Sequence, residues 1–211
     1  MSACVDPFVV TDAASGLIWS LAYVLMLRRG SVDRVSGVPL LAFAPAITWE
    51  LIYGVVRPTR ELPAFVVPLW LILDAGIVLQ YLRHAEREGR RAWSRLRLLV
   101  TLAICFAIEL SVIHDLDDRD GVWSGFAVNV IMSLAFVAMI RARRDVRGQS
   151  IHIALLKMVG TLVTVPHAYA LHGDQWSLRV FMAVSLLADL TYVVLVARQC
   201  RAQGIRPWSR A

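Results

Sequence analysis

Seven apolar stretches, each long enough to cross a lipid bilayer, run through nearly the whole chain and constrain its fold more than any other feature. A helix needs roughly 17 to 25 apolar residues to span a hydrocarbon core of about 30 Å. The stretches lie near residues 13–29, 37–56, 64–82, 96–114, 121–140, 150–171 and 178–197. The chain is 58% hydrophobic with a mean hydropathy of +0.61, outside the soluble range. The sequence therefore predicts an all-α polytopic membrane protein, with residues 1–211 forming a single seven-transmembrane-helix bundle.

The basic residues are distributed unevenly between the two ends of these spans. Of the 22 Arg and Lys residues, 17 follow span one, lie between spans three and four, follow span five, or end the chain. The positive-inside rule then places the N-terminus outside and the C-terminus in the cytoplasm. Because the positive-inside rule accounts for the net charge of +6, we do not expect the chain to bind nucleic acid. The N-terminus has no basic n-region, so we expect no cleaved signal peptide. Arg outnumbers Lys 21 to 1, which suggests a GC-rich genome and a bacterial cell membrane.

Polar side chains inside the spans are the candidate functional residues. A charged group at the bilayer centre costs roughly 2.5 to 3.5 kcal/mol even on a mild insertion scale, so such residues should face the bundle interior. Four acids and three other polar residues qualify: Glu50, Asp74, Glu109 and Asp189, with Asn129, Lys157 and His167.

The four acids fall at overlapping depths when a helical rise of about 1.5 Å per residue is applied. They could therefore line one cavity. Lys157 is the only Lys or Arg away from the ends of the spans, so pairing cannot neutralise all four acids, and burial favours the neutral form of those left over. A neutral carboxylic acid in a dry cavity is a proton donor. The simpler alternative is that Lys157, Asn129 and Glu109 only join helices together.

Aromatic residues share helical faces with several of these polar groups. They are Trp49, Tyr53, Trp70, Phe126 and Tyr192. Such residues often form interfacial belts or pack between helices. The functional alternative is that their ring faces stabilise a positive charge in the site.

The motif "DLDD" at residues 115–118 matches the DxDD pattern with which soluble class II terpene cyclases protonate an alkene. It lies at the outer end of a span and continues into "RDG", so we interpret it as a solvated turn. The sequence has no DDxxD motif, Gly-rich phosphate loop or GxSxG elbow. Cys4, Cys105 and Cys200 have no CxxC spacing. We therefore expect neither a metal nor a cofactor.

The order of several motifs resembles that of the small integral-membrane terpene cyclases of fungal meroterpenoid and indole-diterpenoid pathways, and of bacterial indole-sesquiterpenoid pathways. The motifs are "TWELIYG" (48–54), "PLWLILDAGIV" (68–78), "FAVNVIMSLAF" (126–136), "RGQSIHIALLKMVGTLVT" (147–164) and "LADLTY" (187–192). The Arg-rich composition makes the chain most similar to the bacterial cyclases of drimane-type prenylated indoles.

The resemblance implies that Glu50 and Asp189 are the essential catalytic pair. It further implies metal-free, proton-initiated cyclisation of the farnesyl chain of a prenylated indole or other aromatic, through a carbocation. Trp49, Tyr53, Trp70, Phe126 and Tyr192 would stabilise that cation, and the other intramembrane polar residues would support the site. Initiation at an alkene or at an epoxide stays open, as does the choice of donor between the two acids. The alternative function is a seven-helix proton-coupled transporter or sensor that uses the same acids.

Overall fold

The computed structural model describes residues 7–59, 62–87 and 91–210, and within them it forms seven α-helices and no strand. The helices are α1 (Pro7–Asp33), α2 (Leu40–Leu51), α3 (Val66–Arg87), α4 (Arg91–Leu116), α5 (Val122–Arg143), α6 (Ile151–His172) and α7 (Trp176–Ala202). A π-helical turn, Ile52–Val56, extends α2, and a short 3₁₀ turn, Pro207–Ser209, follows α7. Cys105 and Cys200 are free thiols, whereas Cys4 lies outside the described residues.

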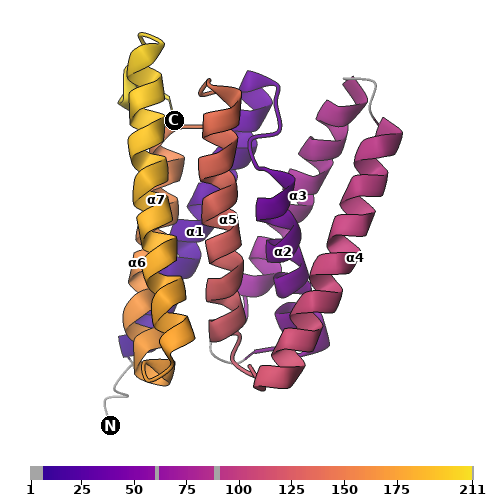
Figure 1. Cartoon of the computed structure of the whole chain (residues 1–211), viewed down its shortest axis with the longest axis vertical. Coiled ribbons are helices and arrows are strands. Elements are labelled where there is room, and N and C mark those ends of the chain that lie inside the picture. The colour runs from indigo at the N-terminus through magenta and orange to yellow at the C-terminus, as the bar shows by residue number, and fades with distance from the viewer. Residues whose placement is uncertain (1–6, 60–61, 88–90, 211) are drawn as a thin grey trace.

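The helices pack in two layers (Figure 1). In the view of Figure 1, α7, α5, α2 and α4 form the front row, and α6, α1 and α3 lie behind it. Contacts between neighbours run from α1 to α6, α7, α5, α2, α3 and back to α1, so six helices form a closed ring. Helix α4 lies outside this ring and packs mainly against α2.

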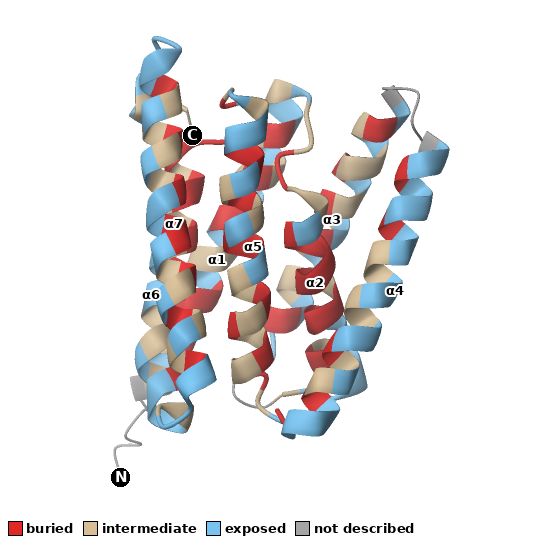
Figure 2. Cartoon of the chain, viewed as in Figure 1, coloured by how far each residue is buried: buried red, intermediate tan, exposed pale blue. Residues whose placement is uncertain are grey.

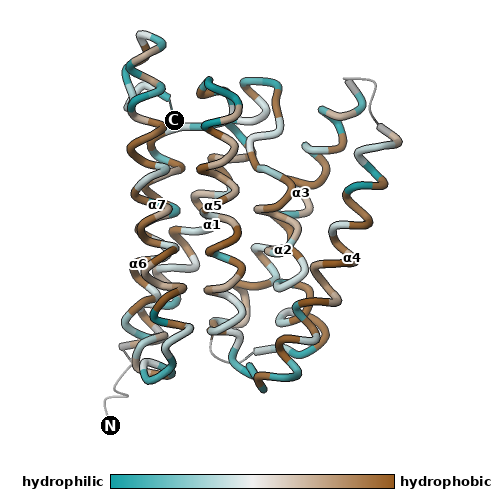
Figure 3. Tube along the Cα trace, in the orientation of Figure 1, coloured by the Kyte–Doolittle hydropathy of each residue, from teal (hydrophilic) through white to brown (hydrophobic). Residues whose placement is uncertain are grey.

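Six of the helices are long and apolar enough to cross a membrane, while α2 with its π turn is a shorter apolar helix. Hydrophobic residues fill the middle of the bundle and hydrophilic ones gather at its two ends (Figure 3). Many large apolar side chains face outward, including Ile72 at 70% exposure and Leu99 at 65% (Figure 2 shows the exposed faces). Such outward apolar faces are expected where lipid replaces water as the solvent. The predicted all-α membrane bundle is confirmed, and the orientation of its termini stays a prediction.

The end of α2 departs from regular helical geometry beside the polar residues of interest. Pro45 lies inside the helix and has no N–H to donate. After Leu51 the helix widens, and the Arg57 N–H donates to the Ile52 carbonyl five residues back at 2.7 Å. Single π turns of this kind occur frequently at functional sites. Here the turn begins two residues after Glu50.

Close contact between α1 and α6 depends on a residue without a side chain. A Cβ added to Gly160 would lie 2.7 Å from the Trp19 ring, so glycine is required for the indole to lie against α6. The Ser15 hydroxyl donates to the Gly160 carbonyl at 3.0 Å. This packing fixes Trp19 on the inner side of the ring of helices.

Candidate active site

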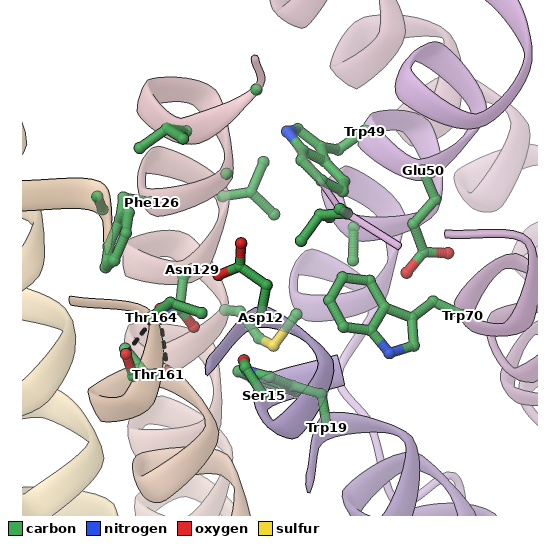
Figure 4. A pocket seen from close by; sticks show the side chains of 18 of the residues that line it. Asp12, Ser15, Trp19, Trp49, Glu50, Trp70, Phe126, Asn129, Thr161 and Thr164 are labelled. Atoms are coloured by element: carbon green, nitrogen blue, oxygen red, sulfur yellow. Dashed lines mark hydrogen bonds between the residues drawn. The ribbon is translucent and has the colours of Figure 1, made fainter. Parts of the chain in front are cut away.

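A cavity of about 170 Å³ lies inside the ring of six helices. Residues of α1, α2, α3, α5 and α6, with Leu62 and the turn before α5, line it. Its wall is mainly apolar and includes the aromatic rings of Trp19, Trp49, Trp70 and Phe126 (Figure 4). A space of this shape and polarity suits an apolar molecule with few polar groups.

Glu50 lies on the cavity wall from α2, next to Trp70 (Figure 4). The side chain is buried, and its Oε1 atom accepts a hydrogen bond from the Tyr23 hydroxyl at 3.4 Å. The other oxygen, Oε2, has no hydrogen-bond partner. Glu50 therefore brings a buried carboxyl group, held on one oxygen by Tyr23, to the edge of an apolar cavity.

Asp74 of α3 lies directly behind Glu50 and does not line the cavity. It is fully buried, no N–H or O–H group of the described residues donates to either of its oxygens, and its carboxyl group interacts directly with that of Glu50. Within the described part of the chain, no ion pair joins either acid to a base. Two buried carboxyl groups side by side cannot both ionise without a large cost, so the pair retains at least one proton.

Asp189 has a different environment from Glu50. Its Oδ1 atom lies 2.5 Å from Lys157 Nζ, and both side chains are fully buried. The same ammonium donates to the Ser133 hydroxyl at 2.5 Å and to Asn129 Oδ1 at 3.3 Å. Asp189 is thus the counter-ion of the lysine, and neither side chain lines the cavity. We predicted that the four acids could line one cavity, but only Glu50 does so.

The other predicted residues divide between the cavity and the surrounding packing. Trp49, Trp70, Phe126, Asn129 and His167 line the cavity. Tyr53, Tyr192, Asp74, Glu109, Lys157 and Asp189 do not.

The two tyrosines outside the cavity both serve local packing. The Tyr53 hydroxyl donates to the Asp118 carbonyl oxygen at 2.5 Å and ties α2 to the turn before α5. Tyr192 donates to Gln149, and its ring packs against Phe136 at 5.1 Å. Their contacts give neither ring a face toward the cavity.

Glu109 lies on α4, outside the ring of six helices. It is buried, its two oxygens have no hydrogen-bond partner, and it approaches Thr48 of α2 from the side away from the cavity. Its position separates it from the Glu50 and Asp74 pair.

Sequence reasoning missed a polar and aromatic stripe on α1. Asp12, Ser15, Trp19 and Tyr23 all line the cavity. Their spacing of three and four residues puts them on one helical face, which was the available signal. Asp12 was not predicted as an intramembrane acid because the apolar stretch begins at residue 13, whereas the helix itself begins at Pro7.

The "DLDD" motif is only partly a solvated turn. Asp115 and Asp117 are exposed, as predicted, but Asp118 is buried and accepts the Ser124 N–H at 2.8 Å, near the start of α5. The expectation of solvation is therefore wrong for Asp118, because helix α5 needs an acceptor for its first N–H groups. Among the residues that the structure describes, no three His, Cys, Asp or Glu side chains gather as possible ligands of one metal ion.

Asp120, in the turn before α5, also lines the cavity, and its Oδ2 atom lies 2.6 Å from His172 Nε2. Partial burial works against its ionisation. The Val122 N–H and the His172 ring nevertheless hold the pKa of Asp120 below its usual range. This carboxylate is therefore ionised and already hydrogen-bonded to its neighbours.

Comparison with known proteins gives consistent matches over most of the chain. A family model described as Pyr4-like transmembrane terpene cyclases matches residues 6–201. The Pyr4-family terpene cyclase mfmH of Annulohypoxylon moriforme is 26% identical over 201 residues, which is 87% of this chain and 82% of the relative. The terpene cyclase ascF of Acremonium egyptiacum is 26% identical over 80% of this chain and 69% of its own length. The asnovolin H synthase nvfL of Aspergillus novofumigatus is 25% identical, with coverage of 82% and 78%. No solved structure matches the chain.

Proposed function

The chain belongs to the Pyr4-like transmembrane terpene cyclases, and from this premise we propose that it cyclises the farnesyl chain of a prenylated indole or similar aromatic by proton-initiated chemistry. As a terpene cyclase it is an enzyme, so the transporter and sensor alternatives are set aside. One observation carries the proposal: Glu50, a buried acid with a second buried acid, Asp74, behind it and no basic partner, lines an apolar cavity inside the membrane bundle.

Glu50 is the proposed proton donor. Its O–H bond breaks, the π electrons of the distal alkene form a new C–H bond, and a tertiary carbocation results. Asp74 supports this step because it lies behind Glu50 and can pass its own proton forward or hydrogen-bond to the carboxylate that forms. An epoxide at the same end of the chain would accept the same proton on its oxygen.

Aromatic rings on the cavity wall then stabilise the carbocation as it moves along the chain. Trp49, Trp70 and Phe126 line the cavity and present electron-rich π systems to a positive charge. Each ring closure uses the π electrons of the next alkene, and a final proton loss restores neutrality. The apolar wall also keeps water from trapping the cation.

Asp189 acts in this proposal through Lys157 rather than on the substrate. Its carboxylate neutralises the buried ammonium, which in turn holds Asn129 on the cavity wall. The Asp189 carboxyl group is already bonded to the Lys157 ammonium and does not line the cavity. We therefore assign the initiating proton to Glu50 and a positioning role to Asp189.

The finer substrate class and source rest on motif order and composition. The motif order resembles that of both fungal and bacterial members, and only the Arg-rich composition favours the bacterial cyclases of drimane-type prenylated indoles and a bacterial cell membrane. The relatives reported above come from fungi. Independence from metals and cofactors is likewise part of the proposal.

The function is tested by adding a farnesylated indole to membranes that contain the protein. We expect a product of unchanged mass, because cyclisation is an isomerisation, and undiminished turnover in EDTA. Glu50→Gln cannot donate a proton and should lower the rate by roughly 10²- to 10⁴-fold, the usual contribution of a general acid. The rate is measured by chromatography of the isomers.

Glu109→Gln is the matched control for this variant. It removes an equally unpartnered buried carboxyl group that lies outside the cavity, so it should retain near-wild-type turnover. Loss of activity in EDTA would contradict the metal-free mechanism. Near-wild-type turnover by Glu50→Gln would remove Glu50 as donor.

A further inference from the structure

A second acid–base pair lies on the cavity wall and has no role in the initiating step. His167 Nδ1 of α6 lies 2.7 Å from Asp12 Oδ2 of α1, and both side chains are largely buried. Both residues line the cavity. Phe8 stacks on the imidazole with ring centroids 4.7 Å apart, which fixes the plane of the ring.

The position of this pair differs from that of Glu50. In Figure 4 the Asp12 carboxyl group lies between the side of the cavity that carries Glu50 and Trp70 and the side that carries Phe126 and Asn129. A substrate held in the cavity therefore meets one acid at one wall and the Asp12–His167 pair at another. This separation suits a reaction that gains a proton at one carbon and loses one at a different carbon.

We propose that His167, oriented by Asp12, is the base that ends the cyclisation. This inference rests on the proposed function and deepens it. The contact with Asp12 places the Nδ1 proton of neutral imidazole toward the carboxylate, which leaves a lone pair on Nε2. The carboxylate also stabilises the imidazolium that forms when Nε2 takes a proton, as in other His–Asp pairs.

The other lining residues are less suited to this role. Glu50 is the donor, and Asp120 is already bonded to His172 and to the Val122 N–H. Asn129, Ser15 and Thr164 carry amide and hydroxyl groups, which are very weak bases. Within the described lining, the Asp12–His167 pair is thus the best available proton acceptor.

The step balances with the groups present. A C–H bond next to the final cation breaks, its electrons form a carbon–carbon double bond, and the proton moves to His167 Nε2. The enzyme ends the cycle with one proton fewer on Glu50 and one more on His167. Exchange with water returns both groups to their starting state, so substrate and product have the same composition.

The inference is tested by His167→Asn in the complete chain, assayed in membranes with a farnesylated indole. The amide can still donate to Asp12, so the wall is preserved while the base is lost. Initiation should continue, but the cation should end elsewhere, as other alkene isomers or a water-trapped alcohol. We expect the share of the wild-type isomer to fall at least about tenfold relative to these products, since a general base contributes about 10²-fold or more.

His172→Asn is the matched control, because His172 forms the same kind of pair with Asp120 at 2.6 Å but does not line the cavity. Its product ratio should equal that of the wild type. If His167→Asn fails to fold, Asp12→Asn should give the same shift in products, because the base loses its orienting carboxylate. An unchanged product ratio, or complete loss of substrate consumption by a folded variant, would overturn the inference. Absence of any cyclised product from the wild-type protein would instead contradict the proposed function.

Discussion

Lys157 is stable in the bundle only because a carboxylate lies beside it. The lysine and Asp189 are fully buried and 2.5 Å apart. Asp189→Asn would leave an uncompensated ammonium, and removal of one partner of a buried ion pair costs about 3 to 5 kcal/mol. The variant should therefore unfold at a lower temperature in detergent, in addition to any loss of activity.

A double-variant cycle separates this effect from catalysis. Lys157→Met combined with Asp189→Asn removes both charges, so most of the lost stability should return. If the double variant is no more stable than Asp189→Asn alone, the ion pair is not the cause of the loss.

The sequence predicted burial of the four acids inside the spans, but it missed the buried Asp12 and Asp118 and did not give the partners of any of them. Glu50, Asp74, Glu109 and Asp189 are all buried as expected. Depth along a helix follows from residue number, whereas the direction of a side chain around the helix depends on neighbours that the sequence does not reveal. That is why Asp189 proved to face Lys157, while Glu50 faces the cavity.

Among the helices, the contact between α1 and α6 places Trp19 on the cavity wall. The indole fits there because Gly160 of α6 has no side chain. Gly160→Val would push the indole away, since even a Cβ would lie 2.7 Å from it. Overpacking of this kind costs about 1 to 3 kcal/mol. We expect a lower unfolding temperature and a changed product ratio, because Trp19 lines the cavity.

Gly76→Ala provides the comparison for this variant. Its Cβ would lie 3.3 Å from the flexible Leu27 side chain, where α3 packs on α1. This substitution should change stability little and leave the product ratio intact. Equal effects of the two substitutions would show that the α1–α6 contact has no special role.

Helix number followed from hydropathy, while helix ends did not. The predicted span at 13–29 is part of a helix that runs from Pro7 to Asp33. Apolar composition marks only the segment that faces hydrocarbon, and helical hydrogen bonds continue past it. The sequence also did not predict the π turn after α2. Its hydrogen bonds between residues five apart depend on packing against the neighbouring turn rather than on residue type.

At the scale of the whole molecule, the order of packing could not be derived from the order of the helices. Chain order places α4 between α3 and α5, yet α4 lies outside a ring made by the other six helices. Consecutive helices need only be near each other at one end. Contacts along their length are decided by which apolar and small-residue faces match.

The closed ring has a kinetic consequence for an enzyme whose product is thicker than its substrate. If the substrate is the proposed farnesyl chain, it is flexible and narrow enough to slide between helices, whereas the rings formed from it need a wider gap to leave. Departure of product should therefore be slower than ring closure. Rapid mixing should show an initial burst of product equal in amount to the enzyme, followed by a slower steady rate. A linear time course from the first turnover would mean that the helices part as easily for the rigid product as for the flexible chain.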